Sequence, residues 1–465
     1  MDIFDILLPP LYLMVIFMIA FKYTINKLKK DAVYRFFLPG LIVKIFGAIA
    51  LGLVYFFYYG GGDTINYHYT ATTFVNLLYS NPGDFLYVYF DQPLKSEFYL
   101  MNSDFSFTYW VNDPYAFFVA KCFVPVLIIC GKSYMASAIV IASICYLAVW
   151  RLYMIFVREF PSLEKQFSWC ILYTPSVVFW GGGIMKDSLT FSATCLYVYG
   201  FYWFFTQKKF KIGYLSALLL GAYLLISIKP YILFALLPGS TLWFITLRIN
   251  RIKNGLVKLL FAPTLIVLGV IVGLFIIQNL GESLGQYSME KVISKASGAQ
   301  QDLKQSYYGG NTFDIGNYEP TVAGMLSVSH KAIFATLFRP TLLDARNIVM
   351  IFSALENTFI LGFCLYLLFK LKVFKFFGLL TSHPLLMFSF VFSLFFAFSV
   401  GASISNFGTL VRLKIPCIPF FLSSLVILNY ILNMTKKYKV KELSEVIAIQ
   451  KSIATSSIRR TTSET

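Results

Sequence analysis

Charged residues are scarce in this sequence. Asp, Glu, Lys and Arg make up 13% of the 465 residues, against about 25% in soluble domains, while hydrophobic residues make up 58%. So low a charged fraction excludes an ordinary soluble domain. The composition predicts an all-α protein that crosses a membrane many times.

Histidines are few and cysteines are unpaired. The three histidines are far apart, and the seven cysteines stand singly, mostly inside apolar runs. This pattern excludes a recognisable histidine or cysteine metal cluster and a disulfide framework. No metal-ligating residue is assigned, and the need for a divalent ion stays open.

Nucleotide-binding motifs are also missing. Neither G-x-G-x-x-G nor G-x-x-x-x-G-K-[ST] occurs, so we expect no Rossmann-type domain, no P-loop and no nucleotide cofactor. The basic residues near the N-terminus follow the first apolar run instead of preceding it. That order predicts a first membrane span and not a cleaved signal.

Long apolar runs predict about eleven membrane-spanning helices in a single transmembrane domain, residues 1–434, followed by a basic, Ser/Thr-rich tail, 435–465. The run 113–131 is apolar enough to span, but counting it would invert every later loop. We therefore expect it to lie as a helix in the outer interface of the membrane. The predicted spans lie near 5–21, 36–58, 134–157, 167–181, 188–206, 212–227, 231–247, 256–279, 349–369, 384–401 and 415–434.

Basic residues gather on one side of this topology. The short connections on that side, the tail and Arg151 hold 25 of the 39 lysines and arginines, so we assign that side to the cytosol. The net charge of +17 then reflects a topology signal that faces anionic lipid, and no nucleic-acid partner is expected. We expect a multi-pass protein of the cell (inner) membrane with its N-terminus outside, its C-terminus in the cytosol and two large outer loops, about 60–133 and 280–348.

Ionisable residues recur at the outer ends of the predicted spans. They occur in the stretches "GGGDTINYH", "GGGIMKDSL", "SIKPY", "FRPTLLDARN" and "NFGTLVRLKIP". Together they suggest an outward-facing pocket that holds an anionic head group beside a carboxylate. The candidate residues are Asp63, His68, Lys186, Asp187, Lys229, Arg339, Arg346 and Arg412.

Simpler interpretations exist for most of these residues. Asp63 after three glycines is a good helix N-cap. Lys229 suits a cation that snorkels to the interface, and Arg412 suits one at the head-group level. Arg339 and Arg346 stand close to Asp344 and could form a structural salt bridge.

The sequence resembles the C superfamily of integral-membrane glycosyltransferases, which use polyprenyl-phosphate sugars as donors. The resemblance covers about 36–250: an acidic residue in the first outer loop, an interfacial helix followed by a span, and the pair "TPSVVFWGGGIMKDSLTFSATCLYVY". The later motifs are also similar to those of uncharacterised bacterial membrane proteins associated with polysaccharide synthesis. The sequence departs from the family in two ways, because Asp63 has no second acidic residue two positions on and follows the second span, not the first.

The resemblance implies transfer of a sugar from a polyprenyl-phosphate donor to a glycan or lipid acceptor on the outer face of the membrane. Asp63 is then the candidate base, His68 orients it or binds the acceptor, and Asp187 is a second carboxylate or the partner of Lys186. The basic candidates would hold the departing phosphate. These are Lys186, Lys229, Arg339, Arg346 and Arg412.

Two other functions fit the same residues. A polysaccharide (O-antigen-like) polymerase or ligase would depend on the later outer cations, and Asp63 would be dispensable. A lipid-linked-glycan flippase or transporter would need charges throughout the membrane depth, whereas Lys44 alone lies well inside a predicted span.

Overall fold

The regular structure is helical in every described part of the chain, and the single β-type contact found there is an isolated bridge between Thr312 and Asn406. This confirms the expectation of an all-α membrane protein. The computed structural model describes residues 3–90, 110, 113–249, 298, 312–319, 321–345, 348–371, 376, 379–380 and 382–434.

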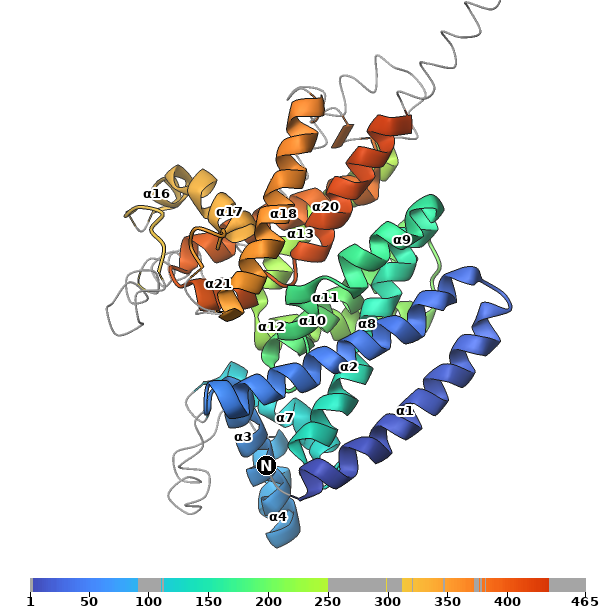
Figure 1. Ribbon diagram of the computed structural model, residues 1–465, viewed down its shortest axis with the longest axis vertical. Coiled ribbons are helices and arrows are strands. Elements are labelled where there is room, and N and C mark those ends of the chain that lie inside the picture. The colour runs from blue at the N-terminus through green and yellow to red at the C-terminus, as the bar shows by residue number, and fades with distance from the viewer. Residues whose placement is uncertain are drawn as a thin grey trace, which may run out of the picture.

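The first half of the chain forms a helical hairpin, a group of short helices and a long helix. In Figure 1, α1 and α2 diverge on one side of the molecule. The elements are α1 (Phe4–Leu28), the 3₁₀ turn η1 (Ala32–Phe36), α2 (Phe37–Leu53), the π-helical turn η2 (Val54–Tyr58), α3 (Asp63–Ser80), α4 (Pro82–Phe90), α7 (Pro114–Ile129) and α8 (Tyr134–Glu159).

The second half begins with a broken segment and continues with longer helices. In Figure 1, α13, α17, α18, α20 and α21 gather on the side away from α1. The elements are η3 (Pro161–Leu163), α9 (Glu164–Phe167), η4 (Ser168–Leu172), α10 (Pro175–Trp180), α11 (Lys186–Phe201), η5 (Tyr202–Thr206), α12 (Ile212–Ile228), α13 (Pro230–Ile249), α16 (Val322–Ser327), α17 (Ser329–Phe338), α18 (Ile348–Leu371), α20 (Pro384–Ser403), α21 (Phe407–Leu413) and a helix Ile418–Met434.

Six described helices are long and apolar enough to cross a membrane, or seven if α21 and the helix Ile418–Met434, bent by 67°, form one span. The expected number of about eleven is not reached. The run 167–181 is divided among α9, η4 and α10, while α11 and α12 are shorter than the other candidates. The predicted span 256–279 lies outside the described residues.

A small second core joins α3, α7 and α8. Its buried side chains include Tyr67 and Phe74 of α3, Phe117 and Phe123 of α7, and Tyr134 of α8. Asp113 caps α7 by accepting hydrogen bonds from the backbone N–H groups of the first turn. The run 113–131 is thus a helix, as expected, and one face of it is buried against α3.

Glycines allow α10 and the turn after it to lie against α2. A Cβ atom on Gly182 would lie 2.8 Å from the backbone nitrogen of Ala48, and one on Gly47 would lie 2.2 Å from the carbonyl oxygen of Val178. Contacts this short are with backbone atoms, which cannot rotate away. The "GGG" of residues 181–183 is therefore a packing requirement as well as a turn.

We expect Gly182→Ala to destabilise the protein by about 1–3 kcal/mol, because the added methyl group forces α2 and the turn apart. Gly213→Ala is the matched control, since a Cβ there meets nothing within 4 Å. Thermal unfolding of both variants in detergent measures the difference. Equal melting temperatures would contradict the close approach.

Candidate functional site

Five of the predicted residues come together from four separate segments of the chain. Arg412 Nη2 lies 2.7 Å from Asp63 Oδ2 and 3.3 Å from Asp187 Oδ2. Lys229 Nζ lies 2.5 Å from the other Asp187 oxygen. Lys186 interacts electrostatically with all four. We call Asp63, Lys186, Asp187, Lys229 and Arg412 the charge cluster.

A turn of three glycines directly precedes Asp63 and positions it in this cluster. Gly60, Gly61 and Gly62 have φ values of +66°, +158° and +121°, which L side chains rarely adopt. Gly62 is the N-cap of α3 and Asp63 is its first residue. The N-cap interpretation of Asp63 is therefore wrong. Its carboxylate accepts a hydrogen bond from Arg412 instead.

The short helix α10 precedes the turn that leads to Lys186 and Asp187, and a buried charge interacts with each of its ends. At its N-terminus, Glu356 of α18 accepts hydrogen bonds from Ser176 N at 2.8 Å and Ser176 Oγ at 2.6 Å. At its C-terminus, Lys44 of α2 donates to the carbonyl oxygen of Gly181 at 2.5 Å. A negative charge at the N-terminus and a positive charge at the C-terminus both match the helix dipole. The turn after α10 leads directly to Lys186 and Asp187.

Burial differs sharply within the charge cluster. The side chains of Asp187 and Lys229 are 2% and 7% exposed, whereas those of Arg412 and Asp63 are 18% and 29% exposed. Asp187 and Lys229 therefore form the inner part of the cluster. Asp63 and Arg412 form its more accessible part.

Positive charge exceeds negative charge in the cluster, with three cations against two carboxylates. Lys186 has no carboxylate within 4.0 Å among the described residues, and its ammonium group lies 5.7 Å from the centre of the Trp110 ring. In the same part of the structure, Arg412 Nε and the buried hydroxyl of Tyr67 have no hydrogen-bond partner among the described residues. The excess positive charge and these two donors suit one more anionic, hydrogen-bond-accepting group.

His68 does not contact Asp63. Its Nε2 atom lies 2.8 Å from the carbonyl oxygen of Lys132, and its ring packs edge-on against Tyr134. Burial lowers the pKa of His68 below the usual value, which favours the neutral imidazole at pH 7. The expectation that His68 orients Asp63 has no support from this geometry.

Arg339 forms a separate ion pair. Its guanidinium binds Asp344 with Nη2 at 2.5 Å and Nε at 3.1 Å from the two carboxylate oxygens. Burial alone would raise the pKa of Asp344, but hydrogen bonds from Arg339 and Thr341 outweigh it and hold the pKa below its usual value. The structural salt bridge weighed from the sequence is thus present, and Arg346 lies outside the described residues.

Lys414 connects that ion pair to the helix that carries Arg412. Its buried ammonium group donates to Asn357 Oδ1 at 2.5 Å and to the carbonyl oxygen of Arg339 at 3.2 Å. Asn357 in turn donates to the carbonyl oxygen of Pro340 at 2.9 Å. The segment after α17 is thereby fixed against α18 and α21.

Functional residues missed by sequence reasoning are chiefly those that hold α10. Lys44 stood out in the sequence only as a cation inside a predicted span, and Glu356 was not among the candidate site residues. Their signal was the burial of a single charge in an apolar run, which has a structural or functional cause by default. The pairing of each with α10 could not be deduced without the fold.

No group of three or more His, Cys, Asp or Glu residues able to hold a metal ion occurs among the described residues. Two cavities lie away from the charge cluster. One of about 900 Å³ lies between α1, α2 and α8, and one of about 560 Å³ lies between η4, α18 and the helix Ile418–Met434.

Comparison of the chain with protein-family models, with characterised proteins and with solved structures gives no match.

We expect Asp187→Asn to destabilise the protein by about 3–5 kcal/mol, because Lys229 would be left as an uncompensated buried charge. Lys229→Gln should cost a similar amount, and the double variant should cost clearly less than the sum. Thermal unfolding in detergent gives the coupling energy. Glu164→Gln is the control, since its partner Arg35 is 54% exposed and such a pair contributes about 1 kcal/mol or less. Additive losses at Asp187 and Lys229 would contradict the pairing.

Proposed function

We propose that this protein is a membrane glycosyltransferase that moves a sugar from a polyprenyl-phosphate donor to a glycan or lipid acceptor. The observation that supports the proposal most is the charge cluster itself. Two carboxylates and three cations from segments distant in sequence meet at the ends of apolar helices. An excess positive charge beside a partly exposed carboxylate suits an anionic lipid head group and a general base.

The donor phosphate would bind between Arg412 and Lys186. Arg412 now contacts Asp63 with one of its nitrogens, and its buried Nε has no partner in the described structure. A guanidinium matches phosphate oxygens with two parallel hydrogen bonds. A phosphate in this position would draw Arg412 away from Asp63 and leave that carboxylate free.

Asp63 would then act as the base. It accepts the proton of the acceptor hydroxyl while the acceptor oxygen bonds to the anomeric carbon of the sugar. The bond from that carbon to the phosphate oxygen breaks, and the electron pair leaves with the phosphate. Arg412 and Lys186 stabilise the resulting charge, and the Asp187–Lys229 pair holds Arg412 in place.

A polymerase or ligase is the alternative that a specific observation favours. Lys414 connects the Arg339–Asp344 pair to the helix that carries Arg412, so the later cations are part of the same framework. On that alternative the later segment binds the glycan lipid, and Asp63 serves only to balance the charge of Arg412.

We also propose that the charge cluster faces the outside of the cell. Ser80, at the exposed end of α3, would then be outside and Lys211, before α12, would be in the cytosol. A cysteine at position 80 should react in intact cells with a thiol reagent that cannot cross membranes, and one at 211 should react only after lysis. The unsubstituted protein gives the background from its seven free cysteines. Labelling of 211 in intact cells would reverse the orientation.

Asp63→Asn should lower turnover by about a hundredfold or more while donor binding persists, because general-base catalysis contributes about 10² to 10⁴-fold. The amide keeps an oxygen that can accept a hydrogen bond from Arg412 but cannot take a proton. Transfer from a polyprenyl-phosphate sugar by the purified protein is the measurement, with Asp84→Asn, a partly exposed carboxylate of α4 outside the charge cluster, as the control. Full activity of Asp63→Asn would remove Asp63 as the base and favour the polymerase alternative.

A further inference from the structure

A long groove runs along one face of α8, at the cavity of about 900 Å³ between α1, α2 and α8. Seven of the α8 residues that line it recur every three or four positions and form a row on one face of the helix. From Val140 to Arg158 this row is about 27 Å long, close to the ~30 Å thickness of the hydrocarbon core. The row consists of Val140, Ser143, Ile144, Leu147, Arg151, Met154 and Arg158, and Tyr146, Trp150, Ile155 and Val157 of α8 line the cavity beside it.

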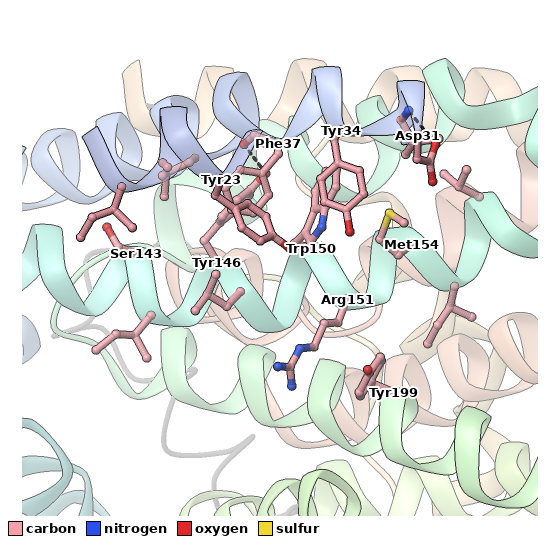
Figure 2. A pocket seen from close by; sticks show the side chains of 18 of the residues that line it. Tyr23, Asp31, Tyr34, Phe37, Ser143, Tyr146, Trp150, Arg151, Met154 and Tyr199 are labelled. Atoms are coloured by element: carbon pink, nitrogen blue, oxygen red, sulfur yellow. Dashed lines mark hydrogen bonds between the residues drawn. The ribbon is translucent and has the colours of Figure 1, made fainter. Parts of the chain in front are cut away.

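The polarity of the groove changes along its length. Its first part is apolar, with Ile144 and Leu147 57% and 51% exposed. Farther along, the exposed cations Arg151 and Arg158 follow on the same face. Figure 2 shows Arg151 extending toward Tyr199. The order of apolar surface followed by cations matches a lipid tail followed by an anionic head group.

Neither arginine has a carboxylate within 4.0 Å in the described structure, although Glu159 interacts electrostatically with the neighbouring Arg158. Arg151 lies over the Tyr199 ring at 5.0 Å and Arg158 over the Trp203 ring at 4.7 Å. Glu159 is engaged by Tyr202 at 2.5 Å and by His383 at 3.4 Å. Asp31 also lines the cavity, but it accepts a hydrogen bond from Val33 N and caps η1.

The position of Arg151 along α8 favours an anionic partner. It lies eight residues before the end of α8, about 12 Å along the helix axis. An exposed guanidinium this far inside a span is costly unless an anion or polar group meets it. Since no carboxylate of the described structure forms an ion pair with Arg151, an anionic lipid head group is a suitable partner.

The covering helix leaves the groove accessible to lipid. Only 6% of the most apolar stretch of α1 is buried. The start of α1 is fixed by Asp5, which accepts from Ser133 Oγ at 2.7 Å, and by Tyr12, which donates to the carbonyl oxygen of Ile129 at 2.7 Å. Its other end packs Tyr23 on Phe37. The cavity lies along the second half of α1, where Ile16, Ile19 and Tyr23 form its wall.

We propose that this groove binds one anionic phospholipid, with its phosphate between Arg151 and Arg158 and an acyl chain along the apolar part of α8. The lipid comes from the leaflet at the Arg158 end. Basic pockets between membrane helices commonly bind such head groups. The site is independent of the charge cluster and of the proposed sugar transfer.

Native mass spectrometry of the full chain in a mild detergent tests the proposal. The protein is given equal amounts of phosphatidylglycerol and phosphatidylcholine with identical acyl chains. Wild type should retain one phosphatidylglycerol in preference. Arg151→Gln with Arg158→Gln should lower the ratio of bound phosphatidylglycerol to phosphatidylcholine by about tenfold or more. Both lipids carry the phosphate, but only phosphatidylglycerol has a net negative charge, and each arginine favours that charge by about fivefold.

Two further variants separate this site from general charge and from misfolding. Arg248→Gln removes an exposed arginine that also lies over a ring, that of Phe244, but does not line the groove, and it should keep the wild-type ratio. Ser143→Phe fills the apolar part and should lower retention of both lipids. Melting temperatures within a few degrees of wild type show that the variants fold.

Three results would overturn the proposal: no preference for phosphatidylglycerol in wild type, an unchanged ratio in the double arginine variant, or an equal change in Arg248→Gln. A competition arm adds a polyprenyl phosphate at the same concentration. Displacement of phosphatidylglycerol by it would assign the groove to a carrier lipid and also refute the proposal. Loss of lipid binding without loss of sugar transfer leaves the proposed enzyme function untouched.

Discussion

A six-residue helix held between two buried charges determines the geometry of the candidate site. In an apolar bundle the backbone groups at a helix break need partners, because the surrounding hydrocarbon supplies none. Glu356 satisfies the N-terminus of α10 and Lys44 its C-terminus, each with the sign that the helix dipole favours. Since these side chains come from α18 and α2, they fix α10 to two other helices. The turn that carries Asp187 is fixed as a result.

The charge cluster has a rigid part and an accessible part. Asp187 and Lys229 are almost fully buried, and burial is tolerable only because each charge has the other as a partner. Asp63 contacts the same Arg412 nitrogen as Asp187 but is far more exposed. On the proposed function, an incoming anion would compete with Asp63 for Arg412 and leave Asp187 in place. This difference in burial suggests separate roles for two carboxylates that look equivalent in the sequence.

Sequence reasoning predicted the class of fold and named all five residues of the charge cluster, because both depend on local signals. Apolar runs revealed the helices, and glycine breaks next to ionisable residues revealed Asp63, Asp187 and Lys186. The number of spans was not predictable in the same way, since α10 is a helix only with the help of Glu356 and Lys44, which are distant in sequence. His68 illustrates the same limit, because its position five residues after Asp63 suggested a contact, but its partner is the backbone at Lys132.

The cations of the charge cluster and the arginines along α8 have different kinds of partner. In the charge cluster, cations and carboxylates from separate segments neutralise one another almost completely, so that only a small excess faces a ligand. Along α8, Arg151 and Arg158 lie over aromatic rings and form no ion pair with a carboxylate in the described part of the chain. A chain with few acidic residues cannot neutralise every cation internally, and a membrane offers phosphate groups as an alternative. The first region therefore suits exchange of an anionic substrate, whereas the second suits a lipid that stays bound as part of the structure.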